Sequence, residues 1–247
     1  GGMTLPTELI SDEIYKIHLD VGMKINRENI KDIGIIRVTP LGAANEVGRS
    51  AFLVSTESSN ILLDAGLKPG ARTLYDEFPA FYLENFIDKL DCVIISHAHF
   101  DHCAALPYLF KYGYRGPVYM TEPTKYLMTL IIKDYLNILQ KEGRDLPYSI
   151  SDLHSALTHI ITLDYGEVVD IAPNIKLTLY NAGHILGSSI VHLHFGEGYH
   201  NLIYTGDFKF AKTRLLEQAF HLFKRNETLI IEGTYGDEKD IMPSRTE

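Results

Sequence analysis

The stretch HAHFDH, residues 97–102, decides the fold of this 247-residue chain. It follows directly on the apolar run CVIIS at 92–96 and leads into a helical pattern over 101–112. Three imidazoles and one carboxylate within this stretch supply the nitrogen and oxygen ligands that zinc accepts. A cluster of such groups at the end of a buried strand therefore predicts a metal site.

The spacing inside this stretch indicates two directions for the ligands. Extended backbone alternates between two faces, so we expect His97 and His99 to point the same way. Asp101 and His102 lie at the turn into the helix, from which they can face a second point nearby. The stretch therefore predicts two neighbouring groups of ligands rather than one.

Other apolar runs also end abruptly in a polar residue that can bind a metal or orient a ligand. These endings are Asp64 after NILL, His184 after KLTLYNAG, Asp207 after NLIYTG and Glu232 after TLII. In α/β sheets, side chains from separate strands converge at the carboxyl ends of the strands. We therefore expect these four residues to gather around the stretch 97–102.

Short β-rich runs alternate with helical patterns from Ile35 onward, which predicts an α/β protein, or α+β in some schemes. Strands are expected over 35–39, 50–55, 60–64, 92–96, 166–171, 175–180, 189–195, 201–205 and 228–232. Helices are expected over 79–89, 101–112 and 122–142, the last with Thr121 as its N-cap. No repeat, low-complexity tract or linker divides the chain.

The length and composition fit one large domain, or most of one. Gly1 and Gly2 are interpreted as an expression scar within an N-terminal extension over 1–34. No apolar run reaches the roughly 18 residues of a membrane helix, and no secretory signal opens the sequence. Cys92 and Cys103 make no disulfide framework, so we expect small buried thiols in a reducing compartment, cytoplasmic or, in a eukaryote, nuclear.

HAHFDH resembles the H-x-H-x-D-H motif of the metallo-β-lactamase superfamily. Six segments together resemble its β-CASP branch, in particular the endonuclease subunit of the cleavage and polyadenylation specificity factor and its archaeal homologues. They are LGAANEVGRSAFLV, NILLDAG, HAHFDHCAALPYL, YNAGHILGSS, YTGDF and IIEGTYG, in the family order from about Arg37 onward. The resemblance implies a partial metallo-β-lactamase αββα sandwich over 35–247 with one exposed face. It would lack the β-CASP insertion and the C-terminal segment, and it would end where a β-CASP domain begins.

The resemblance also implies a role for each matching residue. His97, His99 and His184 would bind a first zinc ion, Asp101 and His102 a second, and Asp207 would bridge both. The same carry-over makes Asp64 the holder of a ligand imidazole in its tautomer and orientation, and Glu232 the residue that orients a catalytic histidine further along the chain. The implied catalytic set is therefore Asp64, Asp101, Asp207 and Glu232. Of the two Zn²⁺ sites, the first is complete and the second lacks one ligand.

The function implied by the resemblance is a zinc-dependent ribonuclease that hydrolyses RNA phosphodiesters with a metal-bridging hydroxide, in RNA 3′-end processing or RNA turnover. The implied partner is RNA, with a homodimer or other RNA-processing subunits as further partners and no membrane. The net charge of −9 argues against a surface that grips nucleic acid everywhere, although bound cations can reverse the sign inside a cleft. The fragment alone could be inactive.

Three alternatives remain open. A thioester or lactone hydrolase of the same fold would use the same H-x-H-x-D-H ligands on a small molecule. A non-catalytic scaffold would keep the fold, but such relatives lose ligand residues, and this chain retains those its length can hold. A DNA-repair nuclease of the same branch fits the segment GAANEVGRS less well than an RNA-processing enzyme does.

Overall fold

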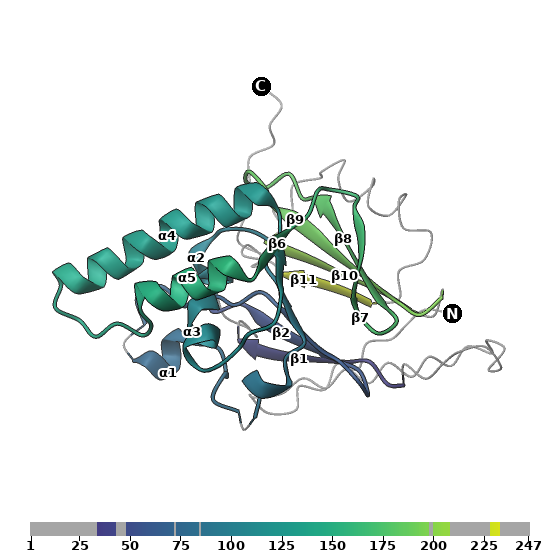
Figure 1. Ribbon diagram of the computed structural model, residues 1–247, viewed down its shortest axis with the longest axis horizontal. Helices are drawn as coiled ribbons and strands as arrows, with labels where there is room; N and C mark the ends of the chain where they lie inside the picture. Colours follow the sequence, from purple (N-terminus) through teal and green to yellow (C-terminus); the bar gives the residue numbers. More distant parts are fainter. Residues whose placement is uncertain are drawn as a thin grey trace, which may run out of the picture.

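A computed structural model describes residues 34–42, 48–71, 73–83, 85–197, 200–207 and 228–232. Within these ranges two β-sheets pack against each other, and helices α2 to α5 lie on the outer side of the first sheet (Figure 1). The predicted N-terminal extension over 1–34 falls outside the described residues except for Gly34. The α/β prediction is confirmed, with both β layers and one helical layer present in the described part of the chain.

The first sheet has six strands in the order β1-β2-β3-β4-β5-β6. The first three pair antiparallel, whereas β3, β4, β5 and β6 run parallel to one another. The carboxyl ends of these four parallel strands therefore meet at one edge of the sheet. The bounds are β1 Arg37–Gly42, β2 Ala51–Ser55, β3 Asn60–Leu63, β4 Cys92–Ile94, β5 Val118–Met120 and β6 Ile160–Thr162.

The second sheet has five strands in the order β11-β10-β9-β8-β7. Strands β7 to β10 form an antiparallel meander, and β11 joins β10 in parallel. The bounds are β7 Val168–Ala172, β8 Ile175–Asn181, β9 Ser189–Phe195, β10 His200–Asp207 and β11 Thr228–Glu232. The parallel pair brings the backbone of Asp207 beside that of Glu232.

Alternation of side chains along β3 divides the apolar residues between two cores. Ile61 and Leu63 face the second sheet and pack with residues such as Leu193 of β9. Leu62 points the other way, into a core shared with the helices. A period of two is what extended backbone imposes, and a strand buried on both faces reads as a continuous apolar run. This explains why NILL carries no polar alternation.

Two of the helices begin at N-cap residues that can be recognised in the sequence. The helix expected over 122–142 is α4, Glu122–Lys141, and the predicted N-cap Thr121 accepts a hydrogen bond from Thr124 N at 3.4 Å. Helix α5, Ile150–Thr158, begins with a capping box between Ser149 and Asp152. The shorter helices are α1 Leu74–Glu77, α2 Phe100–Cys103 and α3 Leu106–Lys111, with a 3-10 turn at Ile87–Lys89.

Two helix predictions need correction. The helix over 79–89 is wrong, because the described residues there form turns and Asn85 has φ 57°, which a right-handed helix cannot continue. The helix over 101–112 is divided into α2 and α3 at Ala104 and Ala105. The strands β5 and β6 and helix α5 were not predicted. The two strands have only three residues each, too few to display an alternation, but the capping box signals α5 in the sequence.

Truncating a leucine between the two sheets should destabilise the protein by a predictable amount. Leu193 is fully buried, so Leu193→Ala is expected to lower the free energy of unfolding by about 2–5 kcal/mol through lost burial and a residual cavity. Urea denaturation followed by circular dichroism measures the change. Leu130→Ala, on the exposed side of α4, is the matched control and should change stability by no more than about 0.5 kcal/mol. Equal losses in both variants would contradict the proposed inter-sheet core.

Candidate metal centre

The site residues gather where the carboxyl ends of β3 and β4 meet the second sheet. Asp64 directly follows β3, and its backbone N–H donates to Ile94 O at 2.8 Å. Ser96 follows β4, and its carbonyl accepts from Ser189 N of β9 at 2.8 Å. The ends of β3 and β4 and the start of β9 therefore lie side by side.

Three imidazoles from two parts of the chain point at one another. His97 Nε2 lies 3.1 Å from His99 Nδ1, and His184 Nε2 lies 3.3 Å from that same Nδ1. One ring nitrogen carries either a proton or a lone pair, so it cannot make a good hydrogen bond to both neighbours. Zinc–nitrogen bonds of about 2.0–2.1 Å in a tetrahedron place ligand nitrogens roughly 3.3–3.4 Å apart. This donor set therefore fits one metal ion.

The loop that carries His184 is fastened to the first turn of α4. Thr121 Oγ1 and Thr124 Oγ1 donate to Gly187 O at 2.7 and 3.0 Å. Ser188 Oγ accepts from the backbone N–H of His184 at 3.1 Å, which closes the loop upon itself. His184 therefore reaches the strand-end histidines because a helix cap and a local turn together fix its backbone.

Asp64 is the fully buried carboxylate beneath these histidines. Its Oδ1 accepts from Ser96 N at 2.7 Å, and its Oδ2 accepts from Ser96 Oγ at 2.7 Å, Tyr204 OH at 2.6 Å and His102 Nδ1 at 2.8 Å. A buried carboxylate is tolerated when such donors replace its hydration. Asp64 has φ 62°, a left-handed conformation that Asp adopts more readily than most residues.

A second group of ligand-type atoms, from Asp64, His97 and His102, also lies within 4.8 Å. Because Asp64 already accepts four hydrogen bonds, we assign this group to a hydrogen-bond network rather than to a second ion. An ionised carboxylate only accepts, so His102 Nδ1 carries the proton of their shared bond. The lone pair of His102 is then on Nε2, the ring nitrogen on the other side.

His102 Nε2 faces the carboxylate of Asp101. The distance from Nε2 to Asp101 Oδ2 is 3.9 Å, which is too long for a hydrogen bond. His102 is buried and Asp101 is partly exposed, so this pair lies at the boundary between the core and solvent. The structure therefore brings the two members of the predicted second ligand group together.

Two glycines permit the close approach of backbone to this site. A Cβ on Gly66 would lie 1.6 Å from Asp101 O, so only glycine lets the strand-end loop pass beneath α2. A Cβ on Gly206 would lie 2.9 Å from Ser96 Oγ and 3.4 Å from His97 Nδ1, and Gly206 has φ 60°. The second sheet therefore touches the site through a residue without a side chain.

Asp207 follows Gly206 directly, so its backbone is adjacent to the site. In β10 and β11 the backbones of Asp207 and Glu232 are paired, but their side chains fall outside what the structure describes. The ligand role of Asp207 and the orienting role of Glu232 therefore remain predictions. Of the predicted site residues, the structure brings together the side chains of Asp64, His97, His99, Asp101, His102 and His184.

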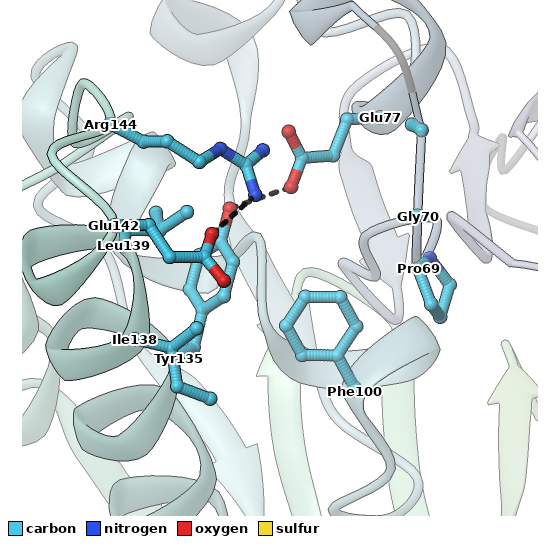
Figure 2. A pocket seen from close by; sticks show the side chains of 10 residues that line it. Pro69, Gly70, Glu77, Phe100, Tyr135, Ile138, Leu139, Glu142 and Arg144 are labelled. Carbon is cyan, nitrogen blue, oxygen red and sulfur yellow. Dashed lines mark hydrogen bonds and ion pairs between the residues drawn. The ribbon is translucent and has the colours of Figure 1, made fainter.

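A cavity of about 340 Å³ borders the segment 97–102, but none of the candidate metal ligands lines it. Phe100, between His99 and Asp101 in the sequence, forms part of its wall (Figure 2). The ring of Tyr135 packs edge-on against Phe100 at 5.0 Å, and its hydroxyl donates to Glu77 Oε1 at 2.6 Å. The packing of Tyr135 of α4 against Phe100 therefore supports the segment 97–102 from the side of α4.

Neither thiol belongs to the groups of candidate metal ligands found among the described residues. Burial raises the pKa of Cys92, as does the neighbouring Asp91 carboxylate, and burial likewise raises the pKa of Cys103 well above its usual value, aided by Asp64 and Asp101. A raised pKa disfavours the thiolate, which is the form that binds metal. Both cysteines are fully buried, which confirms the prediction of small buried residues.

Sequence reasoning missed the hydroxyl groups of the site. Ser96 contacts both Asp64 and His97, while Tyr204 connects Asp64 to Ser50 Oγ, 3.2 Å away. Only the position of Ser96, directly before His97, could have drawn attention to it. Tyr204 lies in a buried strand, where a tyrosine gives no signal of its own.

A fold of two packed sheets with clustered histidines at one shared edge defines a protein whose site could hold a metal ion. The sequence profile of the metallo-β-lactamase superfamily domain matches residues 36–232. This chain therefore belongs to the metallo-β-lactamase superfamily, and the resemblance drawn from its sequence is confirmed. Within the described residues, no helix is both long and apolar enough to cross a membrane.

Archaeal proteins named transcription termination factor FttA are similar to most of this chain. The protein from Lokiarchaeum sp. (strain GC14_75) is 53% identical over 94% of the chain and 36% of its own length. The protein from Methanocaldococcus jannaschii is 50% identical over 95% of the chain and 37% of its own length. The chain thus spans little more than a third of these relatives.

A solved structure shares the fold. A protein of unknown function from Enterococcus faecalis V583 superposes with a TM-score of 0.57 at 17% identity, covering 85% of this chain and 52% of that one. At this identity the similarity concerns the fold alone.

Removing the charge of Asp64 should lower the free energy of unfolding of the metal-free protein. In Asp64→Asn one acceptor oxygen becomes an amide that donates, so at least one of the four buried donors loses its partner. We expect the free energy of unfolding, measured by urea titration in chelator, to fall by about 1–3 kcal/mol. Asp134→Asn, exposed on α4, should change it by no more than about 0.5 kcal/mol. Identical stabilities would show that the network is not stabilising.

The two thiols should be inert in the folded protein. Because burial raises both pKa values, Cys92 and Cys103 stay protonated below their raised pKa, and so at pH 8. We expect no rapid reaction with a disulfide reagent such as Ellman's reagent, and two thiols per chain after denaturation in guanidinium. Rapid labelling of either cysteine in the native protein would overturn this assignment.

Proposed function

We propose that this chain carries the metal centre of a zinc-dependent ribonuclease that acts in RNA 3′-end formation or RNA turnover. The observation that carries the proposal is the convergence of His97 Nε2, His99 Nδ1 and His184 Nε2 at distances suited to zinc. The relatives named as transcription termination factors support RNA as the substrate class. Two ions are proposed, the second held by Asp101 and His102 with Asp207 shared between them.

The residues present divide the work of such a site. His97, His99 and His184 hold the first ion, and the buried Asp64 keeps the proton of His102 on Nδ1 so that Nε2 is available to the second. Bound zinc ions lower the pKa of coordinated water and stabilise the charge that develops on phosphoryl oxygens. Glu232 is proposed to orient a catalytic histidine, the role that the family resemblance implies for it.

The charge of the chain is compatible with an RNA substrate only if the binding is local. A net charge of −9 repels a polyphosphate backbone over most of the surface. Two divalent cations at the strand ends would reverse the sign where the scissile phosphate must lie. The partly exposed His99 and His184 put that position within reach of solvent.

The zinc content per chain tests this proposal directly. We expect inductively coupled plasma mass spectrometry to find between one and two zinc ions per purified wild-type chain. His97→Ala should hold clearly fewer, because it removes one of the three histidine ligands of the first site. His154→Ala, on the exposed side of α5, is the matched control and should retain the wild-type content. Equal zinc in wild type and His97→Ala would refute the metal assignment.

Substrate assays separate the ribonuclease from the small-molecule hydrolase. A labelled single-stranded RNA and a thioester or lactone substrate are each incubated with the zinc-loaded wild type and with His97→Ala. RNA cleavage that is lost in the variant supports the proposal. Hydrolysis of the small substrate alone, lost in the same variant, would favour the other hydrolase.

A further inference from the structure

Ser96 connects the buried carboxylate to a second histidine. Its hydroxyl donates to Asp64 Oδ2 at 2.7 Å, and the same Oγ lies 2.9 Å from His97 Nδ1. The backbone N–H of Ser96 also donates to Asp64, at 2.7 Å to Oδ1. Both contacts with Asp64 hold the side chain of Ser96 in one orientation toward His97.

The position of each proton in the hydrogen-bonded series Asp64–Ser96–His97 follows from which groups can donate. The Asp64 carboxylate only accepts, so the single hydroxyl proton of Ser96 is directed to it. Toward His97 the Ser96 oxygen can then only accept, and the proton of that bond belongs to His97 Nδ1. A neutral His97 with its proton on Nδ1 has its lone pair on Nε2.

We propose that Ser96 is a positioning residue that extends the influence of Asp64 to His97. One carboxylate would then set the tautomers of two ligand imidazoles, His102 by direct contact and His97 through the hydroxyl. The lone pair of His97 then lies on Nε2, the atom that faces His99 Nδ1 at 3.1 Å. The inference rests on the proposed metal centre for its consequence, but the tautomer itself is a property of the metal-free protein.

Ser96 is closely packed among the described residues. Ser96 is fully buried, and the backbone of Gly206 approaches so closely that even a Cβ there would lie 2.9 Å from Ser96 Oγ. His97 is also buried, so water has little access to Nδ1. Loss of the Ser96 hydroxyl would remove the acceptor that holds the His97 proton on Nδ1, so we expect the proton to move toward Nε2, the nitrogen that faces His99.

The ring nitrogens of the histidines report the tautomer directly. Long-range ¹H–¹⁵N correlation spectra of the chelator-treated wild type, with the His97 signals assigned from their loss in His97→Ala, should show His97 protonated on Nδ1. In Ser96→Ala the proton should shift toward Nε2, and Ser96→Thr, which keeps the hydroxyl, should retain the wild-type pattern. A wild-type His97 with an unprotonated Nδ1 would overturn the proposal even if Ser96→Ala failed to fold.

Zinc affinity measures the consequence. In competition with a chromophoric chelator, Ser96→Ala should bind zinc about 10–100-fold more weakly than wild type, as losses of outer hydrogen-bond partners typically do. Ser59→Ala is the matched control, because Ser59 is equally buried but lies in the turn between β2 and β3, away from the candidate ligands. Ser96→Ala with wild-type tautomer and affinity would refute the role of Ser96. A wild type that binds no zinc would instead refute the proposed metal centre, while the spectra still decide the tautomer.

Discussion

The rest of the site depends on the buried carboxylate of Asp64. An ionised carboxylate without water is costly, and here four donors from three residues compensate for its lost hydration. Those donors come from the end of β4, from α2 and from β10, so satisfying one charge fixes three elements relative to β3. Four donors of the protein already contact this carboxylate, three of them at Oδ2. We therefore assign Asp64 to the support of the candidate ligands rather than to the ligand set.

Two different features of the fold place candidate ligands on the two sides of this carboxylate. Parallel pairing of β3 with β4 aligns two strand ends, and the turn into α2 then carries His99, Asp101 and His102 past them. The opposite sheet contributes His184 from a loop after β8, held by hydroxyls at the start of α4. Glycine at 66 and 206 lets these backbones come together. The site thus needs both sheets, and a defect in their packing would disperse ligands that lie far apart in the sequence.

Most of the candidate site could be predicted from the sequence because its residues are close together in the chain and chemically unusual. Histidines and acids at the ends of apolar runs are easily recognised, and HAHFDH places four of them within six residues. Ser96 and Tyr204 escaped notice because hydroxyl side chains are ordinary in strands, and only the fold reveals that both reach one carboxylate. The strands β5 and β6 were missed because three residues cannot show a period. The helix over 79–89 failed because a left-handed residue at Asn85 overrides local apolar spacing.

The arrangement also explains why three imidazoles lie so close together. The ring nitrogens of His97, His99 and His184 converge at 3.1 and 3.3 Å, so a cation bound between them would give all three rings a common partner. Binding of the proposed ion would be coupled to the folding of this edge, because the two packed sheets are what bring the candidate ligands together. The interior hydrogen bonds of Asp64 do the complementary work, because they fix the rings before any ion arrives and so reduce the conformational freedom that binding must remove.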